Sequence, residues 1–198
     1  MLEIGTFPIE TASERKTVSL PEIFAHLCDG SLLGFDGLGA HQRPGWSLFL
    51  YQTAALALVC SGEADAVSDD SAWRALADAE AWRERLAALT PGCADTAWSL
   101  VVEDPAQPAF LQPPIHRGSL DPYKLAGTTP DELDVLVTAK AHDVKPARAA
   151  APAAHDWIFA LTNLQTMQGY SGRGNFGIAR MNGGFSSRPM FMLTPAAD

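Results

Sequence analysis

The chain has 198 residues, of which 47% are hydrophobic and 19% are charged, and its formal net charge at pH 7 is -9. This composition indicates a folded chain, and the length suits one domain with a sizeable core. No apolar run reaches the roughly 18–20 residues that a membrane span needs, and no signal-peptide pattern opens the sequence. We therefore expect a cytoplasmic protein with no membrane partner. The acidic balance argues against non-specific binding of nucleic acid.

The charge is unevenly distributed along the chain. Residues 1–60 carry three basic and six acidic groups, residues 61–137 carry five and fourteen, and residues 138–198 carry six and three. The last third is therefore basic in an otherwise acidic protein. A basic segment is the part of such a chain that suits a phosphate-bearing partner.

The three cysteines, Cys28, Cys60 and Cys93, are odd in number and widely spaced. This pattern gives neither a disulfide framework nor a C-x-x-C metal clip. We expect buried free thiols in a reducing compartment and no bound metal or other cofactor.

The first half of the chain predicts three helices. Ser19 is suited to cap the first, with Pro21 and Glu22 behind it and Gly30 at its end. A turn-rich segment at 35–45 precedes a largely buried helix over 46–60, which Gly62 stops. The segment 68–89 predicts one amphipathic helix, with a stripe of large apolar residues at helical spacing: Trp73, Leu76, Trp82 and Leu86.

The second half predicts shorter elements. Residues 97–104 suggest a short strand, and the prolines of 105–115 favour extended chain. Thr129 and Pro130 are suited to begin a helix or turn, and the alanine- and proline-rich segment 138–154 predicts a loop.

A last helix is predicted over 155–170. Its apolar residues Trp157, Leu161, Leu164 and Met167 share one stripe, which we expect to face the core. Helices together with short strands and long loops indicate an α+β fold in a single mixed domain.

A glycine-rich stretch, QGYSGRGNFGIARMNGG, follows at 168–184 and contains G-x-G-x-x-G at Gly172, Gly174 and Gly177. A dinucleotide fingerprint needs a strand before it, a helix after it and an acidic residue about 20 positions on. Here a predicted helix leads in, the following segment is too short for a crossover helix, and the next acidic residue is Asp198. A phosphate-binding loop of the G-K-[ST] type is also absent from the sequence.

The sequence gives little indication of a metal site or of a catalytic site. His142–Asp143 and His155–Asp156 are adjacent pairs, but neither has a second metal ligand at helical spacing. A surface pair, or Asp156 as the carboxylate at a helix N-terminus, is the simpler interpretation. Ser171 and Ser186 lie in glycine-rich sequence with nothing that marks a general base nearby. We expect no catalytic residues.

The glycine-rich stretch has the composition of an anion-binding loop. Glycines let backbone N–H groups approach a ligand closely, and successive amides can form a nest for an anion. Arginines at 173, 180 and 188 suit phosphate, Asn175 can bond a base edge, and no carboxylate lies between residues 169 and 189. A glycine-rich turn packed under the core, with its arginines solvated, explains the same residues. Both interpretations stay open on these residues alone.

Three stretches resemble CasA, the large subunit of the type I-E CRISPR surveillance complex Cascade. They are QPAFLQP at 107–113, TAKAHDVK at 138–145 and, most strongly, WIFALTNLQTMQGYSGRGNFGIARMNGGFSSRP at 157–189. The resemblance covers most of this chain but only the N-terminal domain of the family. It implies a CasA N-terminal-domain fold over residues 1–198, without the helical bundle that ends family members, which are usually more than twice as long. A PAM-contacting lysine and a duplex-splitting wedge lie in that further part.

The resemblance also implies a function in antiviral defence. CasA-like subunits are non-enzymatic: they bind the PAM of target duplex DNA in its minor groove, help to open the duplex, and later present the target to a helicase-nuclease. A glycine-rich loop of the family lies along that groove. The residues here that would contact DNA are Gly169, Gly172, Arg173, Gly174, Asn175 and Arg180.

A second loop of the family docks on guide RNA and neighbouring Cascade subunits. It corresponds here to Thr138–Lys145, with Lys140, His142 and Lys145 as the contacts. Two alternatives from other classes are a small phosphate- or nucleotide-binding enzyme that uses the glycine-rich loop with His155 and Asp156, and a purely structural scaffold.

Overall fold

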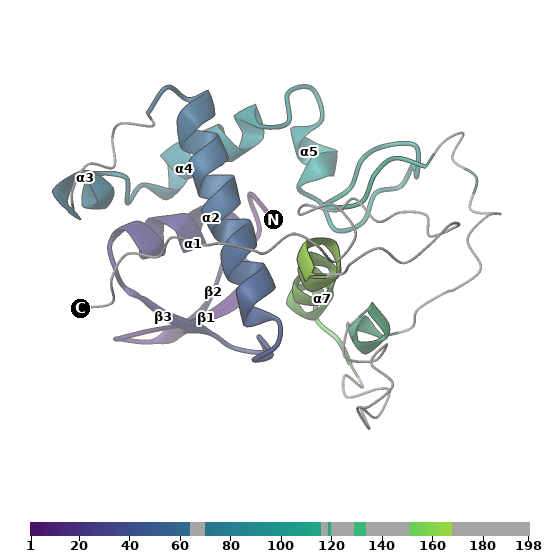
Figure 1. Cartoon of the computed structure of the whole chain (residues 1–198), viewed down its shortest axis with the longest axis horizontal. Coiled ribbons are helices and arrows are strands. Elements are labelled where there is room, and N and C mark those ends of the chain that lie inside the picture. The colour runs from purple at the N-terminus through teal and green to yellow at the C-terminus, as the bar shows by residue number, and fades with distance from the viewer. Residues whose placement is uncertain (64–69, 116–118, 120–128, 134–150, 168–198) are drawn as a thin grey trace.

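The computed structural model describes residues 1–63, 70–115, 119, 129–133 and 151–167. Within them the chain has an α+β fold, as the sequence predicts (Figure 1). A small antiparallel sheet lies at one end of the molecule, and α2 (Arg43–Cys60) runs from it towards α4 (Ala79–Ala88), with α7 (Ala154–Met167) beside its first half. No helix of these residues is long and apolar enough to cross a membrane.

The sheet has the strand order β2-β1-β3, formed by Phe7–Thr11 (β1), Arg15–Val18 (β2) and Leu32–Phe35 (β3). β1 pairs with β2 in the register Phe7↔Val18 and with β3 in the register Ile9↔Phe35. Alternate residues of β1 are buried, as a strand with one face on a core requires. The sequence analysis predicted none of these strands.

The first helix, α1 (Leu20–Cys28), begins as predicted. The Glu22 carboxylate accepts hydrogen bonds from the Ser19 backbone N–H at 2.6 Å and from the Ser19 hydroxyl at 2.7 Å. Burial alone would raise the pKa of Glu22, but the two Ser19 hydrogen bonds and the charges of Lys16 and His26 together hold the pKa below its ordinary value. Gly30 follows the helix at φ 73°, a conformation that favours glycine.

The second helix is also confirmed, and Gly62 follows it at φ 76°. It begins three residues earlier than predicted, at Arg43, because Pro44 and Gly45 are tolerated in its first turn. The turn-rich segment is correspondingly shorter, since Phe35 belongs to β3.

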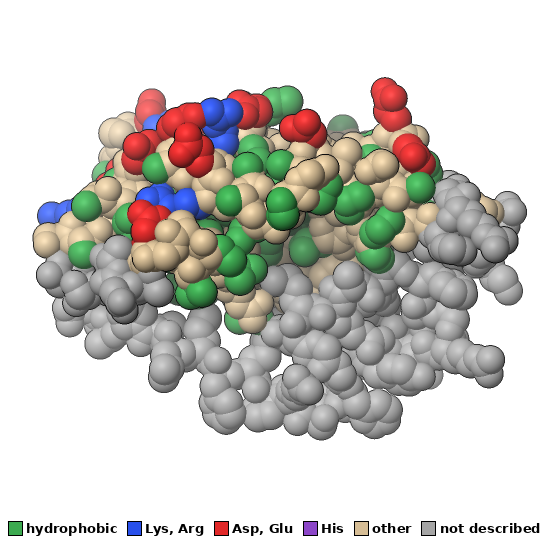
Figure 2. Space-filling view, turned by 90° about the horizontal axis from the view of Figure 1, so that it is seen from above, with side chains coloured by type: hydrophobic (Ala, Val, Ile, Leu, Met, Phe, Trp, Pro, Cys, Tyr) green, Lys and Arg blue, Asp and Glu red, His purple; other side chains and the backbone are tan. Residues whose placement is uncertain are grey.

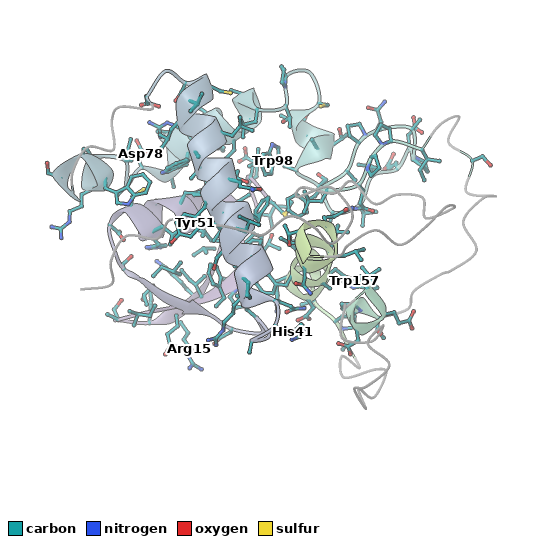
Figure 3. The ribbon with its side chains drawn as sticks, viewed as in Figure 1. Arg15, His41, Tyr51, Asp78, Trp98 and Trp157 are labelled. Carbon is teal, nitrogen blue, oxygen red and sulfur yellow. The ribbon has the colours of Figure 1, made fainter. Side chains whose placement is uncertain are left out.

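The single amphipathic helix predicted over 68–89 is wrong. The described part of this segment forms two helices, α3 (Asp70–Ala75) and α4, separated at 76–78 (Figure 3). Asp78 is the N-cap of α4, and its carboxylate accepts from the backbone N–H groups of Glu80 and Ala81 at 2.9 and 3.3 Å. The Trp82 indole N–H donates to the Leu76 carbonyl at 2.8 Å, a group that a continuous helix would have used.

Three further expectations need correction. Residues 97–104 form no strand, since α5 (Ala94–Ala97) ends there and irregular chain follows. The proline-rich segment is not simply extended: Ala109 and Gln112 form an isolated bridge around a turn in which Leu111 has φ 51°. All three cysteines are free, but only Cys28 is buried, whereas Cys60 is exposed and Cys93 is half-buried.

The remaining short element is the 3-10 helix η3 (Pro130–Leu133), which agrees with the predicted helix or turn. The Glu132 N–H donates to the Thr129 carbonyl at 3.1 Å, whereas the Thr129 hydroxyl, within the described residues, makes no hydrogen bond. Thr129 therefore begins the turn through its backbone and not as a side-chain cap.

An ion pair fastens the end of α2 to α4. The Glu63 carboxylate accepts from Arg85 Nε and Nη2 at 2.6 and 2.8 Å, and the Arg85 guanidinium lies over the Trp82 ring at 5.2 Å. Hydrogen bonds from Arg85 and Ser61 lower the pKa of Glu63 to about 2. Because the Glu63 carboxylate accepts two hydrogen bonds from one guanidinium, the ion pair favours one orientation of Arg85, and with it of α4.

The Asp78 cap is open to a direct test. Asp78→Ala removes the acceptor for two N–H groups at the start of α4, so the protein should lose about 1 kcal/mol of unfolding free energy. Urea denaturation checks this, with Glu84→Ala, an exposed change on the same helix, as control. Equal stability of the two variants would show that Asp78 is not what separates α3 from α4.

Candidate functional site

Every residue that we expected to contact DNA lies outside the described residues. This applies to Gly169, Gly172, Arg173, Gly174, Asn175 and Arg180, and equally to Lys140, His142 and Lys145 of the expected docking segment. The structure instead describes α7, the helix that leads directly into the glycine-rich stretch. The site is therefore built here from what holds α7 in place.

The N-terminus of α7 is fixed against the turn that follows β3. The Asp156 carboxylate accepts from the Ala153 backbone N–H at 2.8 Å and lies 3.6 Å from His155 Nε2. The His155 ring packs edge-on against Phe159, with centroids 6.0 Å apart. A Cβ atom on Gly37 would lie only 3.2 Å from His155 Nε2, and Gly37 has φ 79°, so both space and backbone conformation favour glycine there.

The geometry agrees with the simpler interpretation of His155 and Asp156, a neighbouring pair at the start of a helix. The Asp156 carboxylate acts as the acidic group of the first turn of α7, where it satisfies a backbone donor and favours the helix dipole. The described residues contain no group of three or more metal-ligating side chains, at this place or elsewhere.

The middle of α7 is buried almost all round. Ile158, Phe159 and Ala160 are at most 1% exposed. Phe159 joins an aromatic cluster, with its ring centroid 5.0 Å from that of Trp46 on α2 and 6.0 Å from that of Phe7 on β1. The predicted apolar stripe is therefore wrong in detail: Leu161 is buried, but Trp157 and Leu164 are only half-buried, so the most buried side lies elsewhere.

The last turns of α7 carry polar side chains that are also buried. Thr162, Asn163 and Gln165 are 0% exposed and Thr166 is 3% exposed. The Thr166 hydroxyl donates to the Thr162 carbonyl at 2.6 Å, one turn back. The Asn163 amide makes no hydrogen bond within the described residues through either Nδ2 or Oδ1. Such a group is costly to bury, which sets Asn163 apart from an ordinary core residue.

Gln165 connects α7 to the proline-rich turn. Its Nε2 donates to the Leu111 carbonyl at 2.8 Å, across 54 positions of sequence. Leu111 is the one described non-glycine residue with positive φ, and Phe110 beside it is buried against Phe49 and Trp98. The hydrogen bond therefore joins the end of α7 to QPAFLQP, another of the stretches on which the resemblance rests.

Sequence reasoning missed Gln165 and Asn163. Both were inside a helix that was correctly placed, but amide residues are usually exposed, and the pattern alone gave no reason to bury them. The signal that could have found them is the run TNLQT, which interrupts the apolar face just before the glycines.

Comparisons of the chain with protein-family models, with curated proteins and with solved structures found no significant match.

The two buried amides predict changes of opposite sign. Asn163→Leu has nearly the same branching without polar atoms, so the unfolding free energy should stay equal or rise by about 1 kcal/mol. Gln165→Leu leaves the Leu111 carbonyl without its donor and should lose about 1–3 kcal/mol. Thermal and urea unfolding of the two variants measure this. A strong loss in Asn163→Leu would show that the Asn163 amide has a partner beyond the described residues.

Proposed function

We propose that this chain acts as a non-catalytic, CasA-like subunit of a type I-E CRISPR surveillance complex in the cytoplasm. Its role there is to recognise the PAM in target duplex DNA and to dock on guide RNA and the backbone subunits. A helicase-nuclease acts on the bound target afterwards. No cofactor is part of this proposal.

The observation that carries the proposal is the placement of α7. This helix is buried over residues 158–166 except at Leu164 and is joined through Gln165 to the turn at Leu111, and its described part reaches Met167. The glycine-rich stretch begins at the next residue. A loop that follows a rigidly held helix starts from a fixed position, as a reader of DNA requires.

Glycines suit the minor groove for a steric reason. The groove of B-DNA is only about 6 Å wide and offers a degenerate set of base contacts. A backbone without Cβ atoms can enter it where side chains cannot, and would tolerate several related PAM sequences. The arginines would supply phosphate contacts that add affinity without sequence preference.

The charge of the protein fits a shared mode of binding. The chain is acidic overall, whereas residues 138–198 are basic. Most of the affinity for duplex DNA would then come from the guide and other subunits, with this chain adding selectivity. The position of Asp156 at the N-terminus of α7 also favours a binding role over the alternative of an enzyme that uses the His155–Asp156 pair.

The glycine-rich loop can be tested in an assembled complex that carries guide RNA. Gly172→Leu and Gly174→Leu should leave the fold intact, because a loop that contacts DNA would have few packing contacts of its own, yet abolish PAM-dependent target binding. Arg173→Ala should weaken all sequences about equally and lower the salt slope by roughly one unit. Target affinity for several PAMs at two salt concentrations measures both effects.

Gly184→Leu, in the same stretch but outside the proposed contact set, is the matched control. If the glycine variants unfold the protein, the glycines are structural and the scaffold alternative holds. If they fold and bind every PAM as before, the loop does not touch DNA.

The docking segment has a separate test. Lys140→Glu with Lys145→Glu should weaken association with the remaining subunits and guide RNA, because two contacts to a polyanion become repulsive. Co-purification and binding kinetics measure it. Lys16→Glu with Arg74→Glu makes the same change of charge elsewhere on the surface. Equal association of the two double variants with the remaining subunits and guide RNA would show that Thr138–Lys145 is only a linker.

A further inference from the structure

An apolar groove runs between α1 and α2, and no residue of α7 is among its described lining residues. It has a volume of about 440 Å³. Phe24, Leu27 and Cys28 of α1 form one wall, and α2 forms the other with Tyr51, Ala55 and Leu58 among its residues. Figure 3 shows Tyr51 on the side of α2 that faces α1.

Aromatic side chains from other elements also line the groove: Trp73 of α3, Trp82 of α4 and Phe35 of β3. Several lining residues are large, apolar and open to solvent: Leu27 is 39% exposed, Tyr51 48% and Trp73 36%. In Figure 2, hydrophobic side chains are exposed on the face seen from above, and most charged side chains lie along its upper edge. A patch of this kind marks a surface that another segment covers.

Residues 168–198 contain a segment with matching chemistry. Met190-Phe191-Met192-Leu193 is a run of four large apolar residues, preceded by Arg188 and Pro189. Methionine fills irregular apolar gaps and makes favourable contacts between its sulfur and aromatic rings. The groove offers such rings at Phe24, Phe35, Trp73 and Trp82.

Charge and reach also fit. The described residues that line the groove include no charged side chain, and neither does Met190–Leu193, so docking of this run would bury no charge. α7 packs against α2, the helix that forms one wall of the groove. The intervening residues 168–189 can span roughly 70–80 Å when fully extended, so the run can reach the groove from the end of α7.

We propose that Met190–Leu193 docks into the α1–α2 groove of the same molecule. The interaction does not rest on the function proposed above, since no DNA, guide RNA or Cascade subunit takes part in it. A second copy of the chain and a segment of another protein are the competing occupants.

The test uses one reporter thiol in the full-length protein. Ala55→Cys places it on the exposed part of the groove wall, with the three native cysteines changed to serine. Its alkylation should be slow because the docked run covers it. Phe191→Asp with Met192→Asp should raise the rate about tenfold, since alkylation follows the fraction of molecules with the groove open.

Two controls separate this effect from general loosening. Ser186→Asp with Ser187→Asp adds the same charges outside the apolar run and should leave the rate unchanged. Cys60, exposed on the same helix but outside the groove, serves as the reference thiol in a second single-cysteine protein and should react equally fast in every variant. If the aspartate pair disturbs folding, Phe191→Ala with Met192→Ala should still raise the rate at position 55.

Dilution identifies the occupant. Intramolecular docking gives protection that is independent of protein concentration, whereas a second copy gives protection that disappears on dilution. Equal rates at position 55 in all tail variants, or protection that depends on concentration, would overturn the proposal.

Discussion

The fold depends on the packing of aromatic rings around Trp46. Its ring centroid lies 5.3 Å from that of Phe7 on β1, 5.7 Å from Phe35 on β3 and 5.0 Å from Phe159 on α7, and its neighbour Phe49 is 5.3 Å away on α2. The sheet, α2 and α7 therefore meet at one side chain. Phe159 also lies 6.0 Å from Phe7 and 6.2 Å from Phe35, so α7 and the sheet meet within the same cluster of rings.

Among the described residues, this arrangement leaves a buried hydrogen-bond donor unsatisfied. Trp46 is 1% exposed, and within the described residues its indole N–H donates to nothing. An unsatisfied buried donor costs about 1–3 kcal/mol, whereas each well-placed aromatic pair contributes about 0.5–1.5 kcal/mol beyond its buried area. Four such pairs outweigh one lost hydrogen bond. The core accordingly favours ring packing over hydrogen-bond satisfaction at its centre.

The local signals of the sequence predicted the helices but not their tertiary setting. Ser19 with Glu22, and Gly30 and Gly62 at φ above 70°, act through neighbours in the chain, so their effect can be predicted without a fold. The break at Asp78 was missed because a periodic apolar pattern continues through it, and only the cap geometry separates the two helices. β1 and β3 were missed because strands of five and four residues are defined by partners that lie far away in sequence.

The candidate site, too, could be predicted only in part from the sequence. The helix before the glycine-rich stretch was predictable from its composition and length, and so was the role of Asp156 at its start. The Gln165–Leu111 hydrogen bond was not, because it depends on a turn with positive φ that no pattern in QPAFLQP indicates. The sequence thus predicts a candidate loop that lies outside the described residues, whereas the structure shows how the helix before it is held.

The two proposals have a joint physical consequence. The described part of α7 reaches Met167, and docking of the apolar run would fix the chain again at Met190. Under the two proposals together, residues 168–189 would be tethered at both ends. A tethered segment samples fewer conformations than a free tail, so less entropy would be lost on the proposed entry into a groove of DNA. Glycines in such a loop keep the freedom to follow the groove locally. The apolar run would then support recognition from a distance, without contacting the nucleic acid.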